Sequence, residues 1–128
     1  MAAWEVEYTN EFGVWWNDLS AEEQERVRAA VLVLERHGPA LGRPWVDTVK
    51  GSRHRNLKEL RPRGGFIRVL FAFDIRRAAI LLIGGDKARR WQEWYEEMVP
   101  IADRLYDEHV EAIEREQRTA GRDTTNRS

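Results

Sequence analysis

The chain has 128 residues, which is enough for one domain with its own hydrophobic core and too few for two ordinary domains. Its composition, 42% hydrophobic and 34% charged, is that of a soluble globular protein, and no stretch approaches the roughly 20 apolar residues of a transmembrane helix. The absence of cysteine excludes disulfides, thiolate catalysis and Cys-bound zinc, and the N-terminus lacks the features of a secretory signal, so a cytoplasmic location is expected.

The formal net charge of −1 hides a strong asymmetry along the chain. Residues 43–90 carry 13 basic and 4 acidic side chains, a net charge of +9, whereas residues 1–42 and residues 91–128 each carry a net charge of −5. A basic segment between acidic ones is typical of a protein that meets phosphate groups with one face. The alternative is that these lysines and arginines only solvate the outside of a sheet.

The first forty residues predict one strand and two helices. Apolar and polar residues alternate over residues 4–9, which indicates a strand with one buried face. Asn10 is expected to cap a short helix, and Ser20 with Glu23 forms a capping box at the start of a second one. Gly38 and the proline after it end that second helix, so the two helices form an N-terminal helical hairpin.

Three strands are predicted after a packed loop over residues 40–56. They cover residues 57–61, 66–73 and 78–83, and the polar, Gly-containing segments between them read as tight turns of an antiparallel meander. The last strand is apolar on both faces and should therefore be a central strand.

A long helix with an apolar stripe is predicted from about residue 88 to about residue 117, with Pro100 expected to kink or break it. The polar residues 119–128 are expected to form a disordered tail. The element order β-α-α-β-β-β-α predicts a single α+β domain over residues 1–118. Its sheet is small, four-stranded and mostly antiparallel, with the helical hairpin and the long C-terminal helix packed on it.

The first hairpin of the meander carries the main candidates for catalysis. If its turn sets Arg61 opposite Phe66, then Glu59 lies opposite Arg68 on the same face as Arg61. One interpretation is a cross-strand ion pair between Glu59 and Arg68, worth about 0.2–1 kcal/mol and without function. The other is a carboxylate held ionised beside guanidinium groups that clamp a phosphate, which suits metal-independent RNA cleavage by attack of the 2′-hydroxyl.

A second basic group follows the last strand. Lys87, Arg89 and Arg90 are expected to open the C-terminal helix, where cations oppose the helix dipole, and this cost favours a functional role for at least Lys87. His54 lies in the basic loop and is either a general acid or base or simply solvated. The three histidines lack the spacing of metal ligands and no P-loop is present, so neither a metal nor another cofactor is expected. The aromatic residues that follow are either core or platforms for stacking bases: Trp91, Trp94 and Tyr95.

The ordered motifs LKELR, a Gly-containing turn, FIRVLFAFD, AAILLIGGDKARR and a C-terminal helix resemble the HigB-like branch of the RelE/ParE toxin superfamily, over about residues 4–110. The resemblance implies a RelE-like fold and a bacterial type II toxin, a ribosome-dependent mRNA endonuclease that inhibits translation. It also implies three partners: a cognate antitoxin of the helix-turn-helix type, mRNA and the ribosome.

Through this resemblance, Arg68 matches a phosphate-contacting catalytic arginine of the family, Arg61 the arginine that ends the preceding strand, and Lys87 the basic residue after the final strand. Tyr95 is the nearest candidate for a tyrosine or histidine of the C-terminal segment. Relatives carry lysines on the first meander strand where this chain has Glu59, so the proton-transfer role is left open. The basic residues expected to bind RNA are Arg55, Lys58, Arg63, Arg89 and Arg90.

Two other functions stay open from the sequence. One is a ParE-like inhibitor that binds DNA gyrase and does not cleave RNA. The other is an inactive homologue that binds an antitoxin or a nucleic acid.

Overall fold

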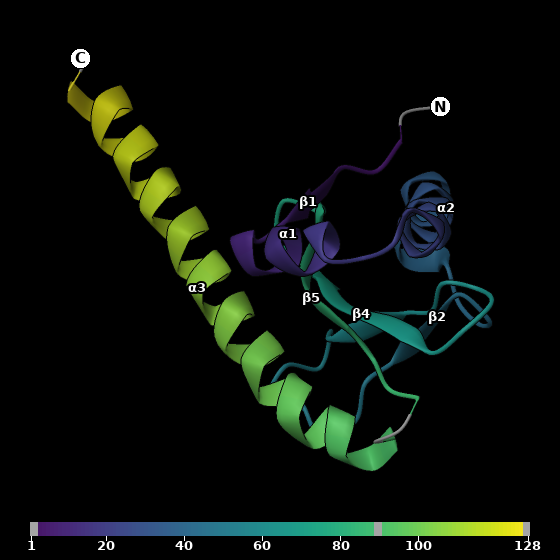
Figure 1. The fold of residues 1–128 in the computed structure, drawn as a ribbon. Coiled ribbons are helices and arrows are strands. Elements are labelled where there is room, and N and C mark those ends of the chain that lie inside the picture. Colours follow the sequence, from purple (N-terminus) through teal and green to yellow (C-terminus); the bar gives the residue numbers. More distant parts are fainter. Residues whose placement is uncertain (1–2, 89–90, 127–128) are drawn as a thin grey trace.

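A five-stranded sheet with helices on both faces forms the body of the protein (Figure 1). The computed structural model describes residues 3–88 and 91–126, with side chains described up to residue 121. In chain order the elements are β1 Val6–Tyr8, α1 Asn10–Asn17, α2 Ala21–His37, a 3-10 turn Gly38–Ala40, β2 Val46–Thr48, β3 Lys58–Leu60, β4 Ile67–Phe73, β5 Ala79–Asp86 and α3 Trp91–Asn126. The strand order is β1-β5-β4-β3-β2, with β1 parallel to β5 and the other pairs antiparallel. The predicted α+β class and the meander are confirmed.

The sheet has one strand more than predicted. β2 lies inside the segment expected to be a loop and pairs with β3, with Val46 opposite Leu60 and Thr48 opposite Lys58. Three residues with a single buried apolar side chain are too short to show an alternating pattern, so this edge strand depends on its neighbour.

Two apolar cores lie on the two faces of the sheet. Alternate residues of β4 face opposite ways, so Val69 and Phe71 pack against α1 and α2, and Leu70 and Ala72 pack against α3. Figure 1 shows α3 crossing one side of the sheet while α1 and α2 lie on the other. This double burial explains why the strand reads as an almost continuous apolar run.

The predicted register of the β3–β4 hairpin was wrong by two residues. Leu60 lies opposite Val69 instead of Ile67, and Glu59 lies opposite Leu70 instead of Arg68. The connection between β3 and β4 is longer than a tight turn. The backbone N–H of Arg61 donates to the Trp45 carbonyl at 2.7 Å, so it pairs towards β2 and not across the hairpin with β4. A shift of two residues preserves the faces, so Glu59 and Arg68 still share one face of the sheet.

The helix boundaries follow their capping residues. Thr9, one residue before the predicted cap, accepts a hydrogen bond on its side chain from the Phe12 backbone N–H at 3.0 Å. The predicted capping box at Ser20 and Glu23 is confirmed by reciprocal hydrogen bonds of 2.9 and 3.1 Å. The second helix ends, as predicted, at Gly38, whose φ of 60° suits a residue without a Cβ.

α3 is a single helix of 36 residues that contains Pro100 without being ended by it. It is described from Trp91 and continues to Asn126, so residues 119–126 are helical where a disordered tail was expected. The contacts of its buried Val99, Ala102 and Leu105 with the sheet offset the backbone hydrogen bond that a proline cannot donate. None of the described helices combines the length and apolarity needed to cross a membrane.

Two glycines of β5 let aromatic rings from both layers approach the sheet. A Cβ added to Gly84 would lie 2.4 Å from the Trp15 ring, and one added to Gly85 would lie 2.4 Å from Nε1 of Trp94. Both distances are far below van der Waals contact. The space that a side chain would fill at these two positions is therefore taken by the protein's own tryptophans.

Gly85→Ala is accordingly expected to reduce the free energy of unfolding by about 1–3 kcal/mol, because the methyl group forces Trp94 and the start of α3 away from the sheet. Denaturant titration measures this difference. Gly42→Ala is the matched control, since an added Cβ there meets no described atom within 4 Å. Equal stability of the two variants would contradict the packing role.

Candidate active site

Five polar residues from four parts of the fold meet on the α3 face of the sheet, and we call them the Glu59 cluster: Glu59, Arg61, Arg68, Lys87 and Tyr95. Glu59 is 3% exposed. Its Oε2 accepts hydrogen bonds from Nε and Nη2 of Arg61 at 2.9 and 2.7 Å, and its Oε1 accepts one from the Tyr95 hydroxyl at 2.6 Å. Both carboxylate oxygens are therefore occupied, which suits a residue that positions its neighbours.

Lys87 is buried directly after β5. Its backbone N–H donates to the Phe66 carbonyl, which extends the pairing with β4. Its Nζ donates to the Tyr95 hydroxyl at 3.2 Å and lies 3.4 Å from the centroid of the Trp91 ring. The charge of Lys87 therefore lies beside the first turns of α3, where the predicted cost of opposing the helix dipole applies.

The electrostatics of the cluster favour a protonated tyrosine and a less basic lysine. Burial, together with the nearby charge of Arg68, lowers the pKa of Lys87. Burial and the hydrogen bond to Glu59 raise the pKa of Tyr95. Although burial opposes its charge, the hydrogen bonds and charge of Glu59 raise the pKa of Arg61. Of these three groups, the lysine is therefore the one whose proton is released more readily than usual.

Arg68 is the least satisfied member. Its Nη1 donates to the Ile67 carbonyl at 2.8 Å, and its Nε is buried without a hydrogen-bond partner in the described part of the chain. The predicted ion pair with Glu59 is absent from the described contacts, because Arg61 and Tyr95 occupy that carboxylate. A buried donor without an acceptor is uncommon in native proteins and suits a site that binds an anion.

A groove with a volume of about 580 Å³ opens beside the cluster. Glu59, Arg61 and Tyr95 contribute to its wall, and the rest comes from β2, the residues after β2 and the first turns of α3. A ligand bound to the cluster can therefore extend along the start of α3.

The structure does not bring His54 into the cluster. Its Nε2 lies 2.8 Å from Oδ1 of Asp107, and its ring packs edge-on against Tyr106. Asp107 follows Tyr95 by twelve residues of α3, which corresponds to about 18 Å along the helix. His54 holds its loop on α3, and its proposed catalytic role has no contact with the cluster to support it.

The residues expected to bind RNA are scattered. Lys58 alternates with Glu59 and so lies on the opposite face of the sheet, Arg55 is exposed, and Arg63 lies over the Trp45 ring at 5.7 Å. Arg89 and Arg90 lie outside the described residues.

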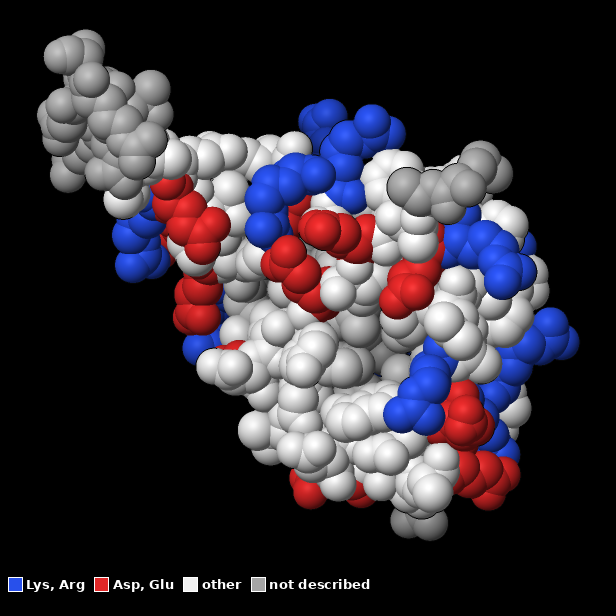
Figure 2. Space-filling model, turned by 90° about the horizontal axis from the view of Figure 1, so that it is seen from above, with Lys and Arg blue, Asp and Glu red and all other residues white. Residues whose placement is uncertain are grey.

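The basic segment is also partly neutralised. Arg43 and Arg61 pair with Asp47, and Arg53 pairs with Asp107. Figure 2 shows the molecule from above, relative to the view of Figure 1. On that face acidic and basic groups lie side by side around a broad uncharged area. The net charge of +9 therefore does not form one continuous basic surface on that face.

Sequence reasoning missed one residue of the site and the role of another. Asp47 pairs with Arg61 at 3.2 Å but lies in a segment taken for a loop. Trp91, 57% exposed, provides a ring for Lys87, whereas Trp94 is buried in the core. The spacing of Trp91 and Tyr95, four residues apart on a helix, was the signal that could have placed both beside one lysine.

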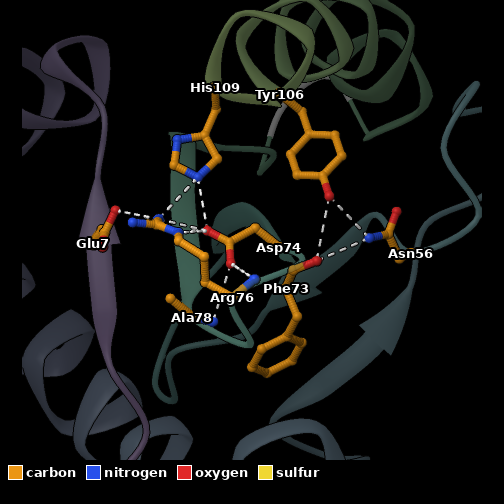
Figure 3. A network of polar contacts seen from close by, with 8 residues as sticks. All are labelled: Glu7, Asn56, Phe73, Asp74, Arg76, Ala78, Tyr106 and His109. Carbon is orange, nitrogen blue, oxygen red and sulfur yellow. Dashed lines mark hydrogen bonds and ion pairs between the residues drawn. The ribbon is translucent and has the colours of Figure 1, made fainter. Parts of the chain in front are cut away.

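A second polar network lies where β1, the β4–β5 turn and α3 meet (Figure 3). The buried Asp74 carboxylate accepts hydrogen bonds from Arg76 and His109, and Arg76 also binds Glu7 at 2.8 Å. Among the described residues, Glu7, Asp74 and His109 come close enough together to bind a metal, a grouping that the sequence did not reveal. The Arg76 guanidinium already supplies positive charge there, so the network serves to hold α3 on the sheet.

Comparison with known proteins places this geometry in a family. The model of the phage-derived protein Gp49-like family (DUF891) matches residues 14–107. "Putative toxin HigB2" of Mycobacterium tuberculosis (strain ATCC 25618 / H37Rv) is 52% identical over 103 residues, covering 78% of this chain and 51% of that protein. "Putative toxin HigB3" of the same organism is 53% identical over 89 residues, covering 70% of this chain and 78% of that protein. The chain thus spans about half the length of HigB2 and more of HigB3.

Solved structures share the fold at low sequence identity. The isolated Escherichia coli RelE toxin superposes with a TM-score of 0.56 at 13% identity, covering 77% of this chain and 99% of that one. RelE of the archaeal RelE–RelB complex from Pyrococcus horikoshii OT3 gives a TM-score of 0.55 at 17% identity, covering 68% and 98%. The chain therefore belongs to the Gp49-like family and is a HigB-like protein with the RelE fold.

Proposed function

We propose that this chain is the toxin of a type II toxin–antitoxin system and cleaves mRNA on the ribosome, in the cytoplasm. The observation that carries the proposal is the pair of cations Arg68 and Lys87 beside Glu59 and Arg61, with a buried Arg68 donor that has no described partner. Such a pair is electrostatically unfavourable until an anion binds between its members. The similarity to HigB2 and HigB3 supports the same function.

In the proposed reaction the scissile phosphate binds between Arg68, Arg61 and Lys87. The 2′-hydroxyl gives its proton to a solvent water molecule, its oxygen forms a bond to phosphorus, and the bond to the 5′-oxygen breaks, leaving a 2′,3′-cyclic phosphate. The two guanidinium groups stabilise the charge of the pentacoordinate phosphate, and Lys87 donates a proton to the departing 5′-oxygen. Glu59 holds Arg61 and Tyr95 in place, and side chains supply the positive charge that a metal ion supplies elsewhere.

Mapping the 5′ ends of cellular mRNA after brief expression of the chain tests this function. We expect new ends within translated regions, and their disappearance when ribosomes are kept off the message. Growth arrest with intact mRNA would contradict nuclease activity. DNA damage signalling under those conditions would instead indicate a gyrase inhibitor.

We also propose a cognate antitoxin of the helix-turn-helix type as the partner. RelE of Pyrococcus horikoshii forms a complex with RelB. Because this chain has the same fold, that complex supports an antitoxin as its partner. Co-expression with the product of the adjacent gene is expected to restore growth and to yield a stable complex. Continued arrest would exclude that gene product as the antitoxin.

The lowered pKa of Lys87 predicts how cleavage depends on pH. A general acid must carry its proton, so the rate should fall as the pH rises through the Lys87 pKa, at a lower pH than the usual lysine value of about 10.4. In Lys87→Arg the side chain stays protonated over the whole pH range. The cleavage rate of this variant should therefore not decline with rising pH, and it should be lower than that of the wild type because arginine gives up its proton less readily. Single-turnover rates on programmed ribosomes measure both profiles. Identical profiles would show that Lys87 does not donate the proton.

A further inference from the structure

The groove continues beyond the Glu59 cluster into a part that the proposed reaction does not use. Its walls there include Val49, Val99 and Pro100. Val49 and Val99 are 8% and 5% exposed and belong to the core under α3, so these walls are packed and preformed. This part of the groove, which we call the slot, has the apolar walls of a site for a flat organic ring.

The polar groups at the rim of this slot come from α3. Gln92 and Glu96 are four residues apart, which places them on one side of the helix, and both line the groove. Both are exposed, and neither has a hydrogen bond or ion pair in the described part of the chain. Lys50, which follows β2, also lines the groove.

We propose that this slot binds one unstacked nucleobase of the RNA, next to the scissile phosphate, and that Gln92 and Glu96 read its edge. The inference rests on the proposed function and adds the residues that determine its sequence preference. RNA bases outside a helix are recognised by insertion between flat or apolar groups and by hydrogen bonds to their edges. A glutamine amide offers a donor and an acceptor side by side, as bidentate base reading needs.

Charge decides what Glu96 can contact. A carboxylate repels the phosphates that Arg61 and its neighbours attract, so Glu96 does not bind the backbone of the RNA. It accepts hydrogen bonds, and the donors that a base presents are its amino and imino groups. The slot therefore selects a base whose amino group points towards α3, while Lys50 is the group placed to meet the neighbouring phosphate.

The experiment compares cleavage maps of the wild-type chain with those of Gln92→Ala and Glu96→Gln. Both side chains are exposed, so the variants should keep the fold, which thermal unfolding checks. We expect the base preference at one position beside the cut to weaken by about tenfold in either variant, with total cleavage retained within a few-fold. Glu111→Gln is the matched control, because Glu111 is an exposed glutamate of the same helix outside the groove.

The outcomes separate this inference from the function on which it rests. An unchanged base preference in both variants, with cleavage intact, overturns the reading role but leaves the nuclease. A uniform loss at all sites also overturns it, since the residues would then only bind the RNA backbone. If the wild-type chain makes no cuts, the proposed function itself fails.

Discussion

Arg68→Ala is expected to lower the rate of mRNA cleavage by at least about 100-fold, the usual cost of removing one donor that stabilises a developing negative charge. The Nε of Arg68 is buried and has no described hydrogen-bond partner, and the guanidinium lies near Lys87. Cleavage of a defined message on purified ribosomes measures the rate, and loss of growth arrest measures the effect in cells. Full activity in this variant would remove Arg68 from the site.

The same substitution should not weaken the fold. In the described part of the chain the Arg68 side chain donates one hydrogen bond, to the Ile67 carbonyl, and removal of the side chain also relieves repulsion of Lys87. We therefore expect an unchanged or slightly raised melting temperature. Arg104→Ala, which removes an exposed arginine of α3, is the control and should keep activity. The cleavage rate of Arg68→Lys should lie between those of Arg68→Ala and Arg104→Ala, because lysine keeps the positive charge but cannot bind a phosphate with a planar fork.

Asp74→Ala is expected to reduce the free energy of unfolding by about 3–5 kcal/mol, the range for breaking a buried ion pair from one side. The Asp74 side chain is 1% exposed and joins the β4–β5 turn to α3 through His109 (Figure 3). It accepts hydrogen bonds from the backbone N–H groups of Arg76 at 2.8 Å and Ala78 at 3.2 Å. Removing it leaves these backbone donors without their acceptor and leaves the Arg76 guanidinium with Glu7 as its acceptor. Urea titration measures the loss.

The pH dependence of stability gives an independent check on Asp74. Burial alone would raise the pKa of this carboxyl, but hydrogen bonds from Arg76 and His109 outweigh burial and lower it. A lowered folded-state pKa stabilises the protein above the unfolded value of about 3.9, and that stability is lost as the pH falls through the folded-state pKa. The difference between wild type and Asp74→Ala should therefore shrink below about pH 4. Asp18→Ala, at an exposed aspartate, should show neither effect.

Local patterns predicted the elements well where each signal was complete within a few residues. Ser20 and Glu23 form their capping box through neighbouring backbone groups, and Gly38 ends its helix by its own φ. β2 was missed because three residues carry no period, and the end of α3 was missed because a polar composition does not by itself prevent a helix.

In the candidate site, too, some features follow from the sequence and others depend on tertiary contacts. The sequence alone predicted that Glu59, Arg61 and Arg68 share one face of the sheet, and this held because side chains alternate along a strand and the register error was two residues. Tertiary structure decided that Glu59 binds Arg61 and Tyr95 instead of Arg68, that Lys87 is buried between Trp91 and Tyr95, and that His54 lies elsewhere on α3. Those contacts join residues up to 53 positions apart, and they depend on the conformation of the β3–β4 connection and on the seating of α3, which no local pattern records.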